Sequence, residues 1–165
     1  MSEATAPHGI RMIDVGGKPV TIRTARASAR LAAGAETIRR LRAGELEKGD
    51  AITAARIAGI MAAKRTSEIV PLCHPLPLET VEVAIAFPEA GIVAIDTVVR
   101  ATARTGVEME ALVAASAAAL TIYDMCKSID PDMVVERIRL EEKTGGVRGD
   151  YSRRVEVSPR DGSPR

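Results

Sequence analysis

Aromatic side chains are scarce in this chain, whose 165 residues include Phe87, Tyr123 and Tyr151 and no tryptophan. Proteins that bind single-stranded nucleic acid stack the bases on aromatic rings, so a stacking platform is hard to build here. Net charge is equally scarce, because 23 basic residues are balanced by 22 acidic ones and the sum is +1. We therefore expect neither nucleic acid nor a membrane surface as a partner.

Cysteine is limited to Cys73 and Cys126, which have no CxxC spacing. Two such cysteines favour reduced thiols over a disulfide. No uninterrupted apolar run approaches the ~20 residues that cross a membrane, and the first residues, MSEATAPHG, lack the basic start and apolar centre of a secretory signal. We therefore expect a cytoplasmic protein.

Length and composition predict one domain. With 46% hydrophobic and 27% charged residues, the chain can bury one core and still keep a polar surface. Residues 1–10 and 158–165 are small, polar or charged, with prolines and nothing to bury, so we expect two flexible ends. The single domain then spans residues 11–157.

Strand and helix periods alternate between these ends. Strands are predicted over 19–27, 80–87, 91–103 and 133–140, with a hairpin turn at 88–91. Helices are predicted over 36–42, from an N-cap at Asp50, and from about residue 107 onward. The order β-α-α-β-β-α-β favours an α+β fold, with helices packed on one side of a mostly antiparallel sheet.

The helical segment GVEMEALVAASAAALTIYDMCK, residues 106–127, carries charge only near its ends. Asp124 and Lys127 stand three positions apart and therefore share one helical face. One interpretation is an exposed ion pair worth ~0.3–0.5 kcal/mol. We favour the other, a desolvated acid–base couple with shifted pKa values. A helix that is apolar all round in a small domain also predicts a neighbouring subunit over one of its faces.

Two acids begin this helix. Thr105 and Glu108 match the capping box, in which side chains satisfy the free N–H groups of the first turn. Glu110 suits the helix dipole, but both carboxylates can also accept hydrogen bonds from the N–H edge of a guanine-like ring. The structural and the ligand-binding interpretation of Glu108 and Glu110 both stay open.

The segment PLCHP, residues 71–75, holds His74 between two prolines that restrict the backbone. Such rigidity suits either a fixed binding contact or a purely structural loop. A zinc site made of Cys73, His74 and Cys126 is disfavoured, because adjacent ligands are awkward and no ligand-pair spacing supports it.

Two loops have features of anion sites. Lys48 stands just before the predicted helix start at Asp50, where a cation and free N–H groups can hold a phosphate, although a solvated loop lysine is the alternative. The segment TGGVRGD, residues 144–150, lacks the GxxxxGK[ST] spacing of a P-loop. Its backbone donors can still wrap an anion.

Three motifs, AARIAGIMAAKRTSEIVPLCHPL, TGVEMEAL and ALTIYDMCKSID, closely resemble the cyclic pyranopterin monophosphate synthase family of molybdenum cofactor biosynthesis. The resemblance covers roughly residues 23–150. It implies a ferredoxin-like α+β fold with helices on one face, a homohexamer built as a trimer of dimers, and active sites between subunits. It also implies a lyase that converts 3′,8-cyclo-7,8-dihydroguanosine 5′-triphosphate into cyclic pyranopterin monophosphate and pyrophosphate.

The resemblance also implies roles for individual residues. Asp124 matches the catalytic acid–base, Lys127 its partner, and Lys48 a further lysine of the site. The implied substrate-binding residues come from PLCHP, from VEMEA and from two basic positions: Leu72, Cys73, His74, Glu108, Met109, Glu110, Arg23 and Arg104. The two arginines fall where basic residues can grip the triphosphate. No metal ligand and no required cofactor is implied, although Mg²⁺ can accompany the triphosphate substrate.

The C-terminal loop departs from the family. Family members commonly read SGGKSGD, whereas TGGVRGD places Val147 at the lysine position and Arg148 beside it. Neighbouring side chains of an extended loop can point to opposite sides, so replacement of that lysine by Arg148 is open. Two other functions compete: a catalytically silent ligand-binding homologue, and a zinc-dependent cyclohydrolase acting on a guanine nucleotide.

Overall fold

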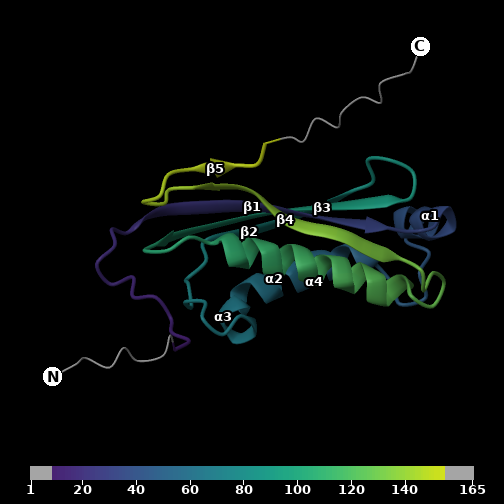
Figure 1. Cartoon of the computed structure of the whole chain (residues 1–165). Coiled ribbons are helices and arrows are strands. Elements are labelled where there is room, and N and C mark those ends of the chain that lie inside the picture. The colour runs from purple at the N-terminus through teal and green to yellow at the C-terminus, as the bar shows by residue number, and fades with distance from the viewer. Residues whose placement is uncertain (1–8, 155–165) are drawn as a thin grey trace, which may run out of the picture.

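The computed structural model describes residues 9–154. Within this range a five-stranded sheet is covered by helices on one face (Figure 1). The expected flexible ends, 1–10 and 158–165, lie outside the described residues apart from residues 9 and 10. The last three residues of the expected domain, 155–157, lie outside them as well.

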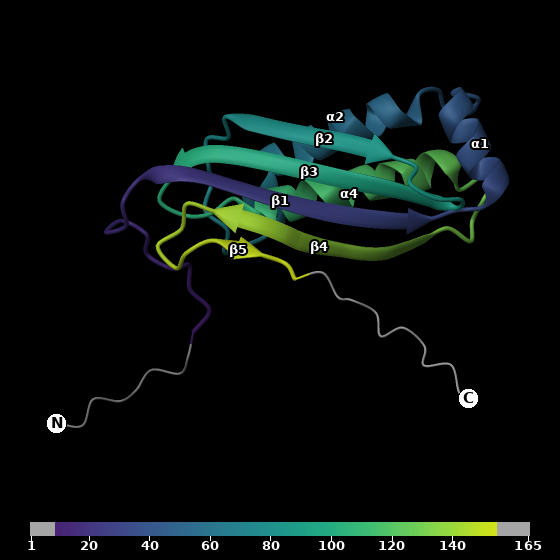
Figure 2. The same ribbon diagram turned by 90° about the horizontal axis from the view of Figure 1, so that it is seen from above.

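All neighbouring strands of the sheet run antiparallel, in the order β2-β3-β1-β4-β5 (Figure 2). The five strands are β1 (Thr21–Ala32), β2 (Thr80–Ala86), β3 (Ile92–Ala103), β4 (Val134–Thr144) and β5 (Tyr151–Ser152). In β1, alternate residues from Ala25 to Leu31 are buried, as expected of a strand with one face on the core. Their neighbours on the other face include Arg26, Ser28 and Arg30.

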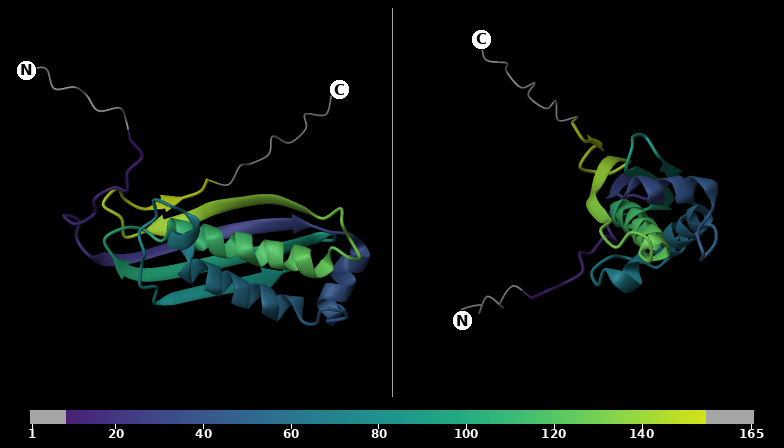
Figure 3. Two further views of the ribbon diagram at one scale, coloured as in Figure 1. Left: turned by 90° about the horizontal axis from the view of Figure 1, so that it is seen from below. Right: turned by 90° about the vertical axis from the view of Figure 1, so that its right-hand side faces the viewer.

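Two long helices lie side by side beneath the sheet (Figure 3). The helices are α1 (Ala35–Ala43), α2 (Ala51–Lys64), α3 (Thr66–Ile69) and α4 (Glu108–Cys126). Asp50 caps α2 by accepting a 3.0 Å hydrogen bond from the Thr53 N–H. Gly44 ends α1 in the left-handed conformation, φ 69°, which glycine adopts without steric cost.

Small residues bring the layers close together. A Cβ at Gly59 of α2 would lie 3.0 Å from the carbonyl oxygen of Ala114 in α4, so the crossing of the two helices needs glycine. The buried hydroxyl of Thr97 in β3 donates to the Ala111 carbonyl at 2.8 Å and fastens the first turns of α4 to the sheet. The alanine-rich helix is therefore held by close backbone packing, with few large side chains.

The predicted element order is confirmed, including the hairpin turn between β2 and β3, and so is the α+β class with an antiparallel sheet. Strands β1 and β4 extend beyond their predicted ends because they pair with each other through two bulges. The short elements α3 and β5 were not predicted. The capping box at Thr105 and Glu108 is wrong, since α4 begins at Glu108 with Val107 as its N-cap and no side-chain cap.

Helix α4 has the length and apolar composition of a membrane-spanning segment, a property that it shares with core helices of proteins that enter no membrane. Its inward-facing residues, among them Ala115, Ala118 and Ile122, are fully buried. The outward face of α2 and α4 instead leaves Ile57, Met61 and Leu120 exposed. An apolar helix surface of this kind is where protein partners commonly bind.

Candidate active site

Two lysines meet one carboxylate at the C-terminal end of α4. The Lys48 ammonium donates to Oδ2 of Asp124 at 2.8 Å and to its backbone carbonyl at 2.9 Å. Lys127 lies 2.8 Å from Oδ1 of the same carboxylate. The three residues assigned catalytic roles by resemblance therefore form one group, which we call the Asp124 cluster.

The Asp124 cluster is exposed in the single chain, with 46% to 56% of each side chain accessible. The expectation of a desolvated couple is therefore wrong for one subunit. Hydrogen bonds from Lys127 and Lys48 lower the pKa of Asp124 to about 2. The same contact raises the pKa of Lys127 above its ordinary value, in the direction opposite to that of a lysine base.

The other predicted residues lie at the N-terminal end of α4. Glu110 is 2% exposed there, and its Oε2 has no hydrogen-bond partner among the described residues. Its Oε1 accepts a 3.7 Å hydrogen bond from the Cys73 thiol. Burial raises the pKa of Glu110, and burial followed by the Glu110 charge raises the pKa of Cys73 to about 11. The thiol therefore acts as a hydrogen-bond donor, while the second carboxylate oxygen is buried without a partner among the described residues.

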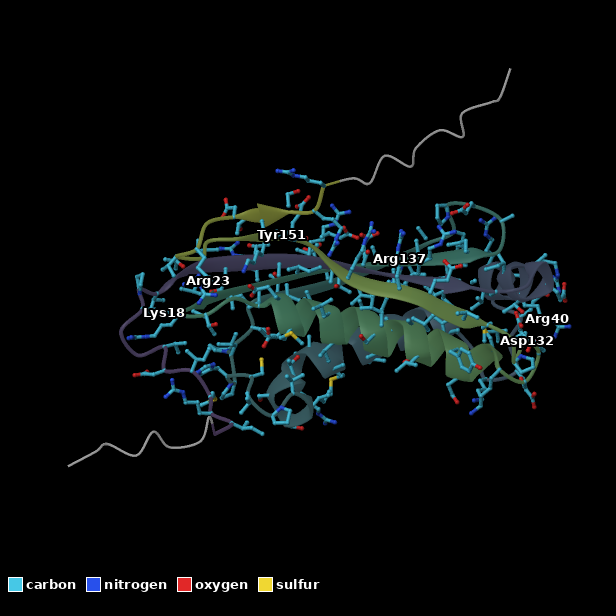
Figure 4. The ribbon with its side chains drawn as sticks, in the orientation of Figure 1. Lys18, Arg23, Arg40, Asp132, Arg137 and Tyr151 are labelled. Atoms are coloured by element: carbon cyan, nitrogen blue, oxygen red, sulfur yellow. The ribbon has the colours of Figure 1, made fainter. Side chains whose placement is uncertain are left out.

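A cavity of about 220 Å³ beside this end of α4 gathers positive charge. It is lined by five basic side chains against one acidic one: Lys18, Arg23, Arg104, Lys143 and Arg148, with Glu108. We call it the cation cavity. Figure 4 shows Lys18 and Arg23 at this end of the molecule and Arg40 at the other. A chain of net charge +1 therefore has a local excess of positive charge at this cavity.

Arg23 is 3% exposed, yet its contacts are backbone carbonyls and not carboxylates. Its Nε donates to the Ala103 carbonyl at 3.2 Å and its Nη2 to that of Arg104 at 3.3 Å. A buried guanidinium without a carboxylate partner keeps its positive charge for a ligand. The predicted role of Arg23 in holding an anion fits this position.

A second cavity, of about 460 Å³, adjoins the first. Its walls include Cys73, His74 and the apolar side chains of Ile13, Val15, Val70, Leu72 and Met109, and we call it the apolar cavity. Ile13, Lys18 and Glu108 line both cavities. Together the cavities form one elongated site, with an apolar end that suits a ring and a basic end that suits phosphates.

Lys143 and Lys18 were not singled out from the sequence. Lys143 stands near the end of β4, where it donates to Oε1 of Glu108 at 2.8 Å. A lysine near a strand end is indistinguishable from a surface lysine until the strand is paired, so the pattern carried no signal. Val147 and Arg148 both line the cation cavity, so Arg148 lies beside the position of the family's loop lysine.

The two parts of the predicted site do not meet within one chain. Glu108 and Asp124 are separated by 16 positions of one helix, a distance of about 24 Å at 1.5 Å per residue. The same separation removes the zinc set of Cys73, His74 and Cys126, because Cys126 is buried at the far end of α4. Among the described residues, no three His, Cys, Asp or Glu side chains gather where a metal ion could bind.

Residues 12–146 match the MoaC family model. Cyclic pyranopterin monophosphate synthase of Herpetosiphon aurantiacus is 57% identical over 141 residues, which are 85% of this chain and 86% of that protein. Proteins of the same name are 54% identical in Heliobacterium modesticaldum, over 88% of this chain and 92% of that protein, and 50% identical in Brevibacillus brevis, over 87% and 89%.

The match includes most of the lining of both cavities, the Asp124 cluster and every strand except β5. It extends over far more than half of the chain, and the relatives are covered at least as fully as the chain itself. The chain therefore belongs to the MoaC family.

Proposed function

We propose that this protein is a cyclic pyranopterin monophosphate synthase, a lyase of molybdenum cofactor biosynthesis. Its substrate is 3′,8-cyclo-7,8-dihydroguanosine 5′-triphosphate, and its products are cyclic pyranopterin monophosphate and pyrophosphate. The observation that carries the proposal is the elongated site, whose apolar end and basic end match the two ends of this substrate. Membership of a family whose curated relatives bear this name supports it.

The ring end of the substrate fits the apolar cavity. Leu72 and Met109 offer apolar surface in its wall. Glu110 lies buried behind Cys73 and accepts a hydrogen bond from the N–H edge of the guanine-derived ring only once the substrate has moved this wall. Cys73 holds the other oxygen of this carboxylate, and His74 lines the same cavity. The ligand-binding role of Glu110 stays part of the proposal, because its side chain lines neither cavity.

The triphosphate fits the cation cavity. Closing the cyclic phosphate requires an oxygen to attack the α-phosphorus while pyrophosphate leaves, and negative charge grows on the leaving oxygens. Arg23 and Lys143 stand where they can stabilise that charge. Mg²⁺ enters this proposal only as a companion of the triphosphate, and the chain's own residues require no cofactor.

The proton transfers of ring opening and phosphate closure are assigned to the Asp124 cluster. Asp124 is the acid–base, with Lys127 and Lys48 as its partners, and the pKa shifts of the exposed cluster call for a change of surroundings before it reacts. Burial against another surface would raise the pKa of Asp124 and lower that of Lys127. A second subunit supplies such a surface.

We therefore place the active site between two copies of the chain, with the Asp124 cluster of one facing the cavities of the other. The exposed apolar side chains of α2 and α4, Ile57, Met61 and Leu120, support the contact. A two-fold axis across the middle of α4 would set opposite ends of the helix together in two equivalent sites. The homohexamer, a trimer of dimers, is the assembly proposed.

Two further expectations belong to the same proposal. The strand order β2-β3-β1-β4, with helices between β1 and β2 and between β3 and β4, supports a ferredoxin-like topology to which β5 is an addition. A biosynthetic enzyme that acts on a nucleotide derivative is expected in the cytoplasm.

The test is turnover by purified protein of enzymatically generated 3′,8-cyclo-7,8-dihydroguanosine triphosphate, with pyrophosphate and the pterin product measured together. We expect both products in equal amounts, and neither from Asp124→Asn or Lys127→Ala. Arg40→Ala, an exposed change at a distance from both cavities, is the control and should turn over like the wild type. Tight binding without product would instead identify a catalytically silent homologue.

A further inference from the structure

The segment of residues 11–18, which precedes β1, forms one wall of both cavities although it belongs to no helix or strand. Ile13 and Lys18 line the cation cavity and the apolar cavity alike. A tight turn shapes the segment, since the Gly16 N–H donates to Oδ1 of Asp14 at 2.7 Å and the Lys18 N–H to the Val15 carbonyl at 3.0 Å. The turn fixes the direction in which Lys18 leaves the backbone.

A side chain from the far side of the cation cavity holds this turn. The Arg104 guanidinium donates through Nη1 to the backbone carbonyls of Gly16 and Lys18. The backbone of Arg104 is itself held, because its carbonyl accepts from the buried Arg23. Two arginines in series thus connect the strands β1 and β3 to the segment. Arg104, expected to grip the triphosphate, donates through one guanidinium nitrogen, Nη1, to the protein backbone.

Lys18 differs from Arg104 in this respect. Among the ion pairs within residues 9–154, none includes Lys18, whereas Lys143 is paired with Glu108. Lys18 also lines both cavities and therefore stands where they join. A substrate with its ring in one cavity and its phosphates in the other has the α-phosphate at that junction.

We propose that residues 11–18 are a substrate-binding strap, in which Lys18 binds the α-phosphate and Arg104 is the positioning residue that holds the strap in place. The inference rests on the proposed function for the identity of the substrate. Lys18 then stabilises the phosphorus from which pyrophosphate departs, and the strap closes the side of the site that the helices leave open. An unpaired ammonium can contact a phosphate without first breaking an ion pair within the protein.

The test uses inorganic triphosphate as the probe and measures its binding by calorimetry, because this readout does not depend on turnover. Lys18→Ala should weaken binding roughly tenfold to a hundredfold, the loss of one charge-assisted contact. Arg40→Ala removes one positive charge at the other end of the molecule and should leave the affinity unchanged. Equal affinity of wild type and Lys18→Ala, or no triphosphate binding by the wild type, overturns the role of Lys18.

The contact between Arg104 and the strap has its own readout, which is hydrogen exchange of the backbone amides of residues 16–18. Arg104→Ala should accelerate this exchange and raise KM, whereas Lys18→Ala should leave the exchange as in the wild type. Unchanged exchange in Arg104→Ala overturns the positioning role of Arg104. If Lys18→Ala turns over like the wild type with an unaltered KM, the substrate-binding role of the strap is wrong and the proposed function stands. If the wild type shows no turnover but its triphosphate binding depends on Lys18, the proposed function is wrong and the strap stands.

Discussion

The Lys143 ammonium lies 2.8 Å from Oε1 of Glu108, so the last long strand meets the first residue of α4 inside the cation cavity. Glu108 thereby neutralises one of the five cations that line the cavity. The pair sets the charge that an incoming triphosphate meets.

Separate substitutions of this pair should act in opposite directions on anion binding. Lys143→Ala removes a cation and should weaken binding of inorganic triphosphate by roughly tenfold. Glu108→Gln removes the competing carboxylate and should leave that affinity equal or stronger. Calorimetry of both variants decides the matter, and weaker binding by Glu108→Gln would show that the carboxylate serves the phosphate end.

Glu110→Gln should make stability less dependent on pH. Because burial raises the pKa of Glu110 above 4.5, the folded protein keeps a proton that the unfolded chain releases. The free energy of unfolding of the wild type therefore falls as pH rises above that value, and glutamine cannot contribute to the fall. Denaturant unfolding between pH ~5 and ~8 should show the free energy of unfolding of the variant increasing relative to that of the wild type.

The same variant should bind the substrate worse, because an amide cannot replace the free carboxylate oxygen as an acceptor in every orientation. Equal losses of stability and of binding would assign Glu110 a structural role. Retained stability with lost binding identifies it as a ligand contact.

Mixing two inactive variants tests the interfacial site. Asp124→Asn removes the acid–base at one end of α4, and His74→Ala alters the apolar cavity at the other. In mixed dimers one of the two composite sites is intact, so coexpression should restore roughly a quarter of wild-type activity. Coexpression of Asp124→Asn with Lys127→Ala is the control and should restore none. Recovery in both mixtures, or in neither, contradicts a site shared in this way.

Leu120→Glu should dissociate the assembly. Its side chain is 60% exposed on the outward face of α4, so a carboxylate there leaves the subunit fold intact but must be desolvated in a helix-to-helix contact. Analytical ultracentrifugation should show a smaller species with unchanged circular dichroism. Ile22→Glu, on the open face of the sheet, is the comparison, and dissociation by this variant alone would place the contact on the sheet.

Gly145→Ala should be far more damaging than Gly149→Ala, although both glycines have positive φ values, 82° and 80°. A Cβ at Gly149 meets open space, and the backbone strain alone costs about 1 kcal/mol. A Cβ at Gly145 would collide with the Ile22 carbonyl and force the loop away from β1. We expect a loss of roughly 3 kcal/mol or more in denaturant unfolding. Equal losses would show that the loop yields easily.

Periodic patterns predicted the long elements well, because their signals are local. Val81, Val83 and Ile85 alternate in β2, and Asp50 and Gly44 mark helix ends. The four residues of α3 and the two of β5 are too short for any period to show.

The site was harder to predict, for a physical reason. Sequence spacing places Asp124 and Lys127 on one face of a helix, but it does not say what covers that face, so their exposure in the single chain was missed. Lys18 and Lys143 join the site only through the turn at residues 16–18 and the pairing of β4, which are consequences of the fold.

The length of helix α4 sets the distance and the relative rotation between the two groups of site residues. Each residue added to or removed from it would rotate one end by about 100° relative to the other and shift it by about 1.5 Å. Asp124 would then point in a different direction relative to Glu110. Insertions should therefore be tolerated in the hairpin turn at 88–91, and the number of residues from Glu108 to Cys126 should be as invariant among active relatives as any side chain in the site.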